Sequence, residues 1–290
     1  MTGLILINAY ADMHALSSQA RRLQEELTAR GVPTHVRRNG DIPVSIAGDG
    51  TPQVDTGDYA FCIYLDKDKY TSRLLEQSGL RLYNPHRGIQ ICDDKMDTFL
   101  HLTGKGIPMP RTVPAPLCYY PGIPPREEFL DGVAATLGLP LVVKECYGSL
   151  GAQVYLARTR EELTAIDARL QGRQHLYQEY VAHSAGRDIR AIVIGGRVTA
   201  AMQRVSATDF RSNIELGGVG SPIHLPAEAA ALCERAASLL ELDYCGVDIL
   251  YGPHGFLLCE VNSNAFFEGI EAVTGCNVAG AYADHILRSL

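Results

Sequence analysis

The most informative part of the sequence is Tyr244-Cys-Gly-Val-Asp-Ile-Leu-Tyr251, followed by Gly252-Pro-His-Gly255 and Phe256-Leu-Leu-Cys-Glu-Val-Asn-Ser-Asn264. Two apolar, β-prone runs flank a short turn that contains glycine and proline, a pattern that predicts an antiparallel hairpin. Asp248, Glu260 and Asn262 place oxygen-bearing side chains where a buried strand would normally carry apolar ones. Because an unpaired carboxylate is costly in such a strand, the pattern indicates that a cation compensates it.

The three oxygen-bearing side chains of this hairpin indicate what type of cation would bind there. Glu260 and Asn262 are two residues apart, so they project from the same face of their strand. Asp248 lies on the partner strand, and the turn leaves its register open by one residue. Oxygen ligands without sulfur or imidazole are typical of Mg²⁺ that is held jointly with phosphate oxygens. The alternative is a polar edge hairpin whose acids face solvent, and the apolar flanks of both strands argue against it.

The composition is that of a globular protein with more than one subdomain. The chain has 290 residues, of which 46% are hydrophobic and 20% charged, and a chain of this length usually divides into packed subdomains. Its net charge of -7 argues against a surface that binds nucleic acid. The eight cysteines include no C-x-x-C pair, which favours reduced thiols and a cytoplasmic protein. No apolar run approaches the ~20 residues that cross a bilayer.

The order of predicted elements divides the chain into residues 1–89, 90–182 and 183–290. In the first part, strands at 3–9, 34–38 and 59–65 alternate with helices at 14–30 and 69–77, which predicts a small parallel α/β unit. The first strand has no basic leader, so it is not expected to be a signal peptide. Residues 41–58 are rich in glycine, proline and aspartate and are predicted to be a surface loop.

The other two parts mix helices with hairpins. Asp93 is predicted to cap a helix that ends at Leu102, and Thr159 to cap a helix at 160–170. Further helices are predicted at 127–137, 227–240 and 272–290, and further strands at 139–145, 154–157, 176–181, 189–194 and 198–205, with a loop at 206–222. A homo-oligomer is possible.

A lysine and a glycine loop stand together in the middle of the chain. Lys144 ends a predicted strand immediately before Gly148-Ser-Leu-Gly151. Backbone N–H groups of such a loop can approach phosphate oxygens, and a lysine adds a positive charge. A strand–turn–strand with glycines is also commonly just a hairpin, and the loop is not a P-loop, because it has neither the G-K-[ST] end nor a following helix. The order of features along the chain favours the phosphate-binding interpretation.

That order comprises Lys95, Lys144, Gln178-Glu-Tyr-Val181, Gly186-Arg-Asp-Ile-Arg190, Arg204, Asp209-Phe-Arg-Ser-Asn213, Asp248 and Glu260-Val-Asn262. It resembles the ATP-grasp fold over the whole chain, and within it the RimK-like carboxylate–amine ligases. The most specific pieces are Phe210-Arg-Ser-Asn213 with Gly217-Gly218, and Glu260-Val-Asn-Ser263 with Glu268-Gly-Ile-Glu271. The resemblance implies an α/β (α+β) fold, in which an N-terminal parallel α/β subdomain precedes two ATP-grasp subdomains that clasp the nucleotide.

The resemblance also implies roles for the matching residues. Lys95 and Lys144 would contact the phosphates of ATP beneath a mobile loop formed by Gly148, Ser149 and Gly151. Gln178, Glu179 and Val181 would bind adenine and ribose at a hinge. Asp248, Glu260 and Asn262 would hold two Mg²⁺ ions, with Mn²⁺ as a possible substitute. The acceptor side of the cofactor would be lined by Asp188 and Arg190 and by the catalytic residues Arg204, Arg211 and Asn213.

Several positions leave alternatives open. Many relatives have another glycine where Gln153 stands, so the loop is expected to be stiffer or shaped for another acceptor. The small residues that usually follow the Mg²⁺ ligands are replaced by Asn264-Ala-Phe-Phe267, which leaves the substrate open. The arginines also have a structural interpretation: Arg190 and Arg204 can pair with Asp188 or Glu179, and Arg211 can be solvated.

The inventory of side chains indicates catalysis by positioning and charge neutralisation. No Ser–His–Asp or Cys–His set stands out in the sequence. The resemblance implies that ATP converts a carboxylate into an acyl phosphate, and that an amine, an amino acid of the glutamate type, then forms an amide on a small molecule, peptide or protein. The partners would be ATP, an acid and an amine, with neither nucleic acid nor membrane. The alternatives are an ATP-grasp kinase for a small molecule and an ATP-binding regulatory protein without turnover.

Overall fold

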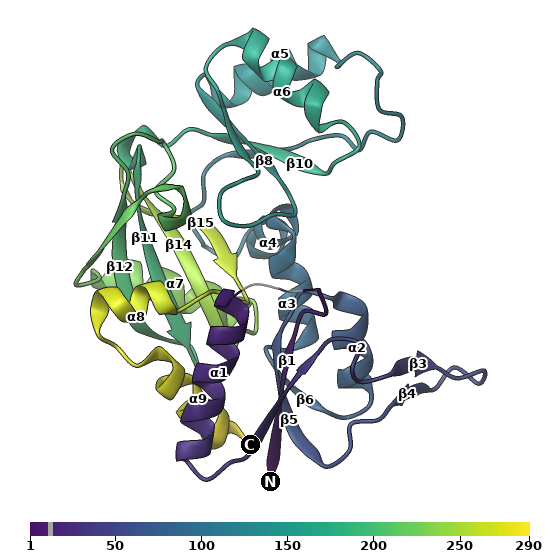
Figure 1. Ribbon diagram of the computed structural model, residues 1–290. Coiled ribbons are helices and arrows are strands. Elements are labelled where there is room, and N and C mark those ends of the chain that lie inside the picture. The colour runs from purple at the N-terminus through teal and green to yellow at the C-terminus, as the bar shows by residue number, and fades with distance from the viewer. Residues whose placement is uncertain (11–13) are drawn as a thin grey trace.

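The structure, a computed structural model, describes residues 1–10 and 14–290. Three sheets of four or five strands form successive parts of the described chain, and a small two-stranded hairpin projects from the first part (Figure 1). No helix in these two ranges combines the length and the hydropathy that a membrane crossing requires.

The N-terminal unit is a parallel sheet in the order β2-β1-β5-β6. Its elements are β1 (Thr2–Ile7), α1 (His14–Ala29), β2 (Thr34–Arg38), β3 (Val44–Ile46), β4 (Pro52–Val54), β5 (Tyr59–Leu65), α2 (Lys69–Gln77), β6 (Arg81–Tyr83) and α3 (His86–Asp93). The central strand β1 is apolar and fully buried at Leu4, Ile5 and Leu6, as expected for a parallel strand covered on both faces. Asn8 and Asp66 directly follow β1 and β5 and therefore lie at the carboxyl edge of the sheet.

The central unit is an antiparallel sheet in the order β7-β10-β8-β9, with helices α5 and α6 together on one side of it (Figure 1). Its elements are α4 (Lys95–Leu102), β7 (Thr112–Pro114), α5 (Glu127–Leu137), β8 (Leu141–Glu145), β9 (Val154–Ala157), α6 (Arg160–Leu170) and β10 (His175–Glu179). Leu130 of α5 and Leu163 of α6 pack with Val143 and Tyr177 of the sheet in a core of their own.

The C-terminal unit is an antiparallel sheet in the order β13-β12-β11-β14-β15. Its elements are η1 (Ala182–Ser184), β11 (Arg187–Ile194), β12 (Arg197–Val205), η2 (Ile214–Leu216), β13 (Val219–Pro222), α7 (Ala227–Leu239), β14 (Tyr244–Gly252), β15 (Gly255–Asn262), α8 (Glu268–Thr274) and α9 (Val278–Ser289). The expected hairpin is confirmed: β14 and β15 pair antiparallel, and Asp248 lies directly opposite Glu260.

The apolar core continues between the first and last units. Helices α1 and α9 lie side by side (Figure 1), and Leu23 of α1 belongs to the same buried cluster as Phe61 of β5, Ile192 of β11 and Tyr282 of α9. The Asn84 side chain fastens this junction, because its Nδ2 donates to the carbonyl oxygens of Tyr244 and Ser263, each at 2.7 Å. The two ends of the β14–β15 hairpin are thereby tied to the N-terminal unit.

Three expectations about loops and a helix cap were wrong. Residues 41–58 are not only loop, because Val44 pairs with Val54 across the β3–β4 hairpin, and residues 206–222 include η2 and β13. Asp94, not Asp93, caps α4: its carboxylate accepts hydrogen bonds from the backbone N–H groups of Met96 and Asp97, whereas residue 93 ends the unexpected helix α3.

The C-terminal segment is two helices rather than one. Helix α8 ends at Thr274, and Gly275 follows in the left-handed region with φ +73°. Asn277 then caps α9, because its side chain accepts a hydrogen bond from the N–H of Gly280 at 2.8 Å. A glycine stop and a new N-cap therefore divide the segment.

Candidate functional site

A cavity of about 110 Å³ lies between the central and C-terminal sheets, and we call it the interdomain cavity. It brings together most of the predicted site residues: Lys95, Lys144, Gly148, Ser149, Gly151, Gln178, Glu179, Val181, Asp188, Arg204, Arg211, Asn213, Asp248 and Glu260. The other two, Arg190 and Asn262, line a neighbouring cavity of about 350 Å³. Four residues, Ser149, Arg204, Asn213 and Glu260, line both cavities, which are therefore adjacent.

Two arginines hold the Asp248 carboxylate. Arg190 lies opposite Asp248 on the neighbouring strand β11, and its Nη2 donates to Oδ2 of Asp248 at 2.7 Å. Arg204 Nη2 lies 3.1 Å from the same oxygen. Burial raises the pKa of Asp248, but the two guanidinium groups outweigh burial and lower it to about 2. Asp248 is therefore a permanent carboxylate at neutral pH.

For Asp188, in contrast to Asp248, burial outweighs the effect of the neighbouring arginine on the pKa. Arg204 Nε donates to Oδ1 of Asp188 at 2.8 Å, yet burial dominates and raises the pKa of Asp188, with Asp248 as a further negative neighbour. The pairing of Arg204 with Asp188, kept open as a structural alternative, is thus present in the structure. Arg204 joins two carboxylates and still lines both cavities.

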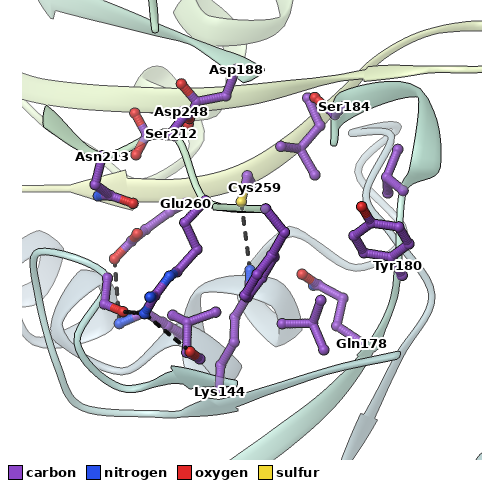
Figure 2. A pocket seen from close by; sticks show the side chains of 18 of the residues that line it. Lys144, Gln178, Tyr180, Ser184, Asp188, Ser212, Asn213, Asp248, Cys259 and Glu260 are labelled. Atoms are coloured by element: carbon purple, nitrogen blue, oxygen red, sulfur yellow. Dashed lines mark hydrogen bonds and ion pairs between the residues drawn. The ribbon is translucent and has the colours of Figure 1, made fainter. Parts of the chain in front are cut away.

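Two buried lysines reach into the interdomain cavity from different elements. Lys95, at the start of α4, donates from Nζ to the carbonyl oxygen of Gly148 at 2.9 Å and lies 3.3 Å from Oε1 of Glu260. Lys144, on β8, extends across the cavity toward Cys259, and its Nζ lies 3.5 Å from that sulfur (Figure 2). Within the described ranges, Lys144 has no carboxylate partner, so its charge is available to an anionic ligand.

The glycine loop between β8 and β9 is held from both sides. Gln153 Oε1 accepts a hydrogen bond from the Ser149 N–H at 3.3 Å, and a Cβ on Gly148 would lie only 2.6 Å from that oxygen. Arg211 Nη1 donates to the carbonyl oxygen of Gly151 at 2.6 Å and its guanidinium pairs with Asp209. Arg211 is therefore not a solvated loop residue but a connection between the loop and the C-terminal unit.

The predicted hinge residues lie at the end of β10, where Gln178 and Glu179 are its last two residues and Val181 follows shortly after. Gln178 Nε2 donates to Oγ1 of Thr112 at 3.0 Å. The Glu179 carboxylate accepts from the backbone N–H of Arg111 at 2.9 Å and from its Nε at 2.7 Å. Tyr180 lies on the same wall (Figure 2). These hydrogen bonds hold the end of β10 in place, and the residues that follow it line the cavity.

Several lining residues were not among the predicted site residues, although the sequence draws attention to Gln153 and to the motif at 210–213. In the interdomain cavity these are Val142, Gln153, Val154, Tyr180, Ser184, Arg187, Phe210, Ser212, Leu250 and Cys259; burial raises the pKa of Cys259, although Lys144 opposes the shift. In the neighbouring cavity, Asn8, Asp66 and Lys67 come from the N-terminal unit. Asn8 and Asp66 had a usable signal, because ligands bind outside the carboxyl ends of parallel strands.

The hairpin donors suit a hard divalent cation. Asp248 and Glu260 are directly opposite each other, and Asn262 is two residues further along β15. Their ligating atoms are oxygens, and Asp248 is ionised at neutral pH. Asp248 is held by two arginines and Glu260 by Lys95, so a cation would share these carboxylates with the basic groups.

Known proteins resemble this chain in sequence. Beta-citrylglutamate synthase B of Danio rerio is 38% identical over 229 residues, 78% of this chain and 55% of that protein. N-acetylaspartylglutamate synthase A of Homo sapiens is 37% identical over 229 residues, 78% of this chain and 57% of that protein. A probable alpha-L-glutamate ligase of Maridesulfovibrio salexigens is 36% identical over 220 residues, 75% of this chain and 70% of that protein. The chain thus spans little more than half the length of the first two relatives.

Solved structures resemble the chain over nearly its whole length. A RimK domain ATP-grasp protein from Sphaerobacter thermophilus has a TM-score of 0.74 at 22% identity and covers 97% of this chain and 98% of its own. D-alanine–D-alanine ligase from Bacillus anthracis complexed with ATP has a TM-score of 0.74 at 16% identity and covers 100% and 98%. At this identity the likeness establishes the fold, which is ATP-grasp.

The RimK-like ATP-grasp domain matches residues 92–286, from the end of α3 to the last turn of α9. This range contains the glycine loop, the hinge, both lysines and the β14–β15 hairpin. The chain therefore belongs to the RimK-like ATP-grasp family.

Proposed function

We propose that this protein is an ATP-dependent carboxylate–amine ligase that forms an amide bond through an acyl phosphate. The observation that carries the proposal is the convergence at one cavity of two buried lysines, a glycine loop and the Asp248–Glu260 carboxylate pair. The amine is an amino acid of the glutamate type, because the relatives are named as a citrylglutamate synthase, an acetylaspartylglutamate synthase and a glutamate ligase. The acceptor is a small molecule, a peptide or a protein.

ATP would lie in the interdomain cavity. Adenine and ribose would face the hinge formed by Gln178, Glu179 and Val181, and the phosphates would face Lys95 and Lys144. The Lys144 ammonium has no carboxylate to satisfy it among the described residues, which supports a role in binding phosphate. Asp188 and Arg190 would flank the acceptor end.

Two Mg²⁺ ions, or Mn²⁺ in their place, would be held by Asp248, Glu260 and Asn262. Bound there, the ions would neutralise charge on the phosphates and orient them. The two arginines around Asp248 would keep its carboxylate ionised, and the strand register holds it opposite Glu260.

The reaction proceeds in two transfers. A carboxylate oxygen of the acid attacks the γ-phosphorus, the bond to the β–γ bridging oxygen breaks, and ADP leaves. The amine nitrogen then attacks the acyl carbon and loses a proton, the carbon–oxygen bond to phosphate breaks, and inorganic phosphate leaves carrying that proton. Arg204 lines both cavities, so its guanidinium can stabilise the oxyanion of the tetrahedral intermediate, with Asn213 beside it.

The glycine loop would exclude water from the acyl phosphate. In its present position it is fastened by Lys95 at Gly148 and by Arg211 at Gly151. A closed loop protects a reactive intermediate from hydrolysis.

The test is ADP release by the purified protein with pairs of carboxylic acids and L-glutamate, combined with trapping by hydroxylamine. We expect ADP release to depend on the acid and Mg²⁺, and a hydroxamate to form when hydroxylamine replaces the amine. Transfer of phosphate to an alcohol without hydroxamate would identify a kinase. ATP binding without turnover on any pair would identify a regulatory protein.

Glu260→Gln tests the metal assignment within the same assay. Loss of the carboxylate should lower the rate at least about 100-fold, or roughly 2.7 kcal/mol of transition-state stabilisation. Glu228→Gln, at an exposed position of α7, is the matched control and should keep the wild-type rate. A folded Glu260→Gln protein with near-wild-type ADP release would overturn the assignment.

A further inference from the structure

The neighbouring cavity of about 350 Å³ adjoins the predicted γ-phosphate end of the site. It shares Ser149, Arg204 and Glu260 with the interdomain cavity. An acid that attacks the γ-phosphorus must place its carboxylate at this shared wall, so the rest of the acid extends into the neighbouring cavity. The chemistry of that cavity therefore selects the acid.

The two adjacent aromatic residues after the metal-binding hairpin have different environments. Phe267 is fully buried and packs edge-on against Tyr244, with ring centroids 6.5 Å apart. Phe266 is only partly buried and lines the neighbouring cavity. Phe267 therefore belongs to the core, whereas Phe266 is available to a ligand.

Phe266 is part of an apolar surface to which several surrounding elements contribute. Its members come from β5, the glycine loop, β12, η2, the segment after β15, and α8: Leu65, Leu150, Met202, Ile214, Ala265, Phe266 and Ile270. Leu150, Ile214 and Phe266 are the more exposed members, and the other four are almost fully buried. Such a surface binds an apolar group by removing it from water.

Leu150 is the unusual member of this surface. It is 37% exposed and has φ +60°, in the left-handed region that costs a leucine about 1 kcal/mol or more. The loop between Gly148 and Gly151 thus carries an exposed apolar side chain at the cavity in a conformation that favours glycine. Contact with an apolar substrate would remove this exposed side chain from water.

The charged residues of the cavity offer no surplus positive charge. Its described lining has the carboxylates Asp66, Glu215 and Glu260 and the cations Lys67, Arg190 and Arg204. Each of these cations already has a carboxylate partner: Asp93 for Lys67, Asp248 for Arg190, and Asp188 and Asp248 for Arg204. An acid with several carboxylates would find no unpaired cation among the described lining residues.

We infer that the acid substrate is a monocarboxylate with an apolar or aromatic group. Its carboxylate lies at the wall shared by the two cavities, where Ser149 and Asn213 offer hydrogen-bonding groups. Its apolar group packs against Phe266 and Leu150 in the neighbouring cavity. The inference rests on the proposed ligase function and adds to it the class of the acid.

The test compares N-acetyl-L-phenylalanine, N-acetyl-L-leucine and N-acetyl-L-aspartate as acids, with ATP, Mg²⁺ and L-glutamate held constant. The three acids share an α-carboxylate and differ in the side group, which in N-acetyl-L-aspartate is a second carboxylate. We expect kcat/KM of the wild type to be at least about 10-fold higher for the two apolar acids. Phe266→Ala should lower kcat/KM for the apolar acids about 10- to 100-fold, change the polar acid less than about 3-fold, and leave the KM for ATP unchanged.

Phe256→Ala is the matched control. Phe256 is a partly buried aromatic residue at the start of β15, and it lines a different cavity. Its removal should therefore leave the preference among acids unchanged. Preference of the wild type for N-acetyl-L-aspartate, or an equal loss for all three acids in Phe266→Ala, would overturn the inference.

Calorimetric binding separates this inference from the proposed function. If no acid supports ADP release, the ligase proposal fails, and the same acids are titrated into the protein with Mg²⁺ and ADP. Tighter binding of the apolar acids that is lost in Phe266→Ala would support the apolar site. Equal binding, or none, would overturn it.

Discussion

Arg211 joins the glycine loop to the C-terminal unit through a geometry that lysine cannot reproduce. Its Nη1 donates to the Gly151 carbonyl oxygen while its Nε and Nη2 bind Asp209; hydrogen bonds from Arg211 lower the pKa of Asp209. We predict that Arg211→Lys raises the KM for ATP about 10-fold, because a single ammonium cannot maintain both contacts. ADP release without acid should increase, since an open loop admits water.

Steady-state ADP release with and without acid measures both effects. Arg197→Lys, at an exposed arginine paired with Glu234, serves as the control and should match the wild type. An unchanged KM for ATP, together with a raised KM for the acid, would instead make Arg211 an acid-binding residue.

At the scale of residues, the sequence predicts which side chains surround the cavity better than it predicts their partners. Asp248, Glu260 and Lys144 stand out because polar groups interrupt apolar strands. The ion pairs of Asp248 with Arg190 and Arg204 depend on the register of three strands that are far apart in sequence. No local pattern encodes that register. The sequence therefore leaves open a pairing of the two arginines with Asp188 or Glu179, and it does not predict their pairing with Asp248.

Helix α4 positions Lys95, and its N-cap fixes where the helix begins. The Asp94 carboxylate accepts from the N–H groups of Met96 at 2.8 Å and Asp97 at 3.2 Å. We predict that Asp94→Ala costs about 1 kcal/mol of stability and raises the KM for ATP several-fold, because the first turn that carries Lys95 is no longer fixed. Asp94→Asn keeps an oxygen acceptor and should remain close to wild type.

Thermal unfolding and the KM for ATP measure the two consequences of the cap. Equal losses of stability in Asp94→Ala and Asp94→Asn would show that the position contributes its charge rather than a helix cap.

At the scale of elements, strongly periodic segments were predicted to within a residue or two, such as α5, α6 and β5. The errors occur where a single hydrogen bond or one left-handed residue decides a boundary. Asp93 and Asp94 are identical side chains one residue apart, and only the fold determines which one faces the free N–H groups of α4. Gly275 ends α8 inside a segment whose composition suits one long helix.

Asn84 couples the N-terminal unit to the hairpin that carries the predicted metal ligands. Its side chain accepts from the Tyr244 N–H at 2.9 Å and donates to the carbonyl oxygens of Tyr244 and Ser263. We predict that Asn84→Ala lowers the free energy of unfolding by about 3 kcal/mol or more, because these buried backbone groups lose their partner. Urea unfolding measures the loss.

Asn39→Ala is the matched control for this coupling. Asn39 bonds to Asp66 and Asp68 within the N-terminal unit, and its loss should cost about 1 kcal/mol. Equal losses for the two variants would show that Asn84 contributes no more than a local bond.

At the scale of the whole molecule, the fold class could be predicted because the order of motifs resembles a known family, not because the elements determine their packing. The shared core of α1 and α9 could not be predicted, because it joins residues more than two hundred positions apart in the sequence. The amphipathic pattern of a helix shows which face is buried but not which element packs against it.

That continuous core has a consequence for motion. The first and last units share one buried cluster, while the central sheet and its helices are packed around another. We therefore expect two rigid bodies, with only the central one swinging when ATP enters. Apart from Ser149 and Leu150, the described walls of the neighbouring cavity belong to the stationary body. The width of the proposed ATP site would therefore change with this motion. The proposed acid-binding surface, apart from Leu150, would keep its shape.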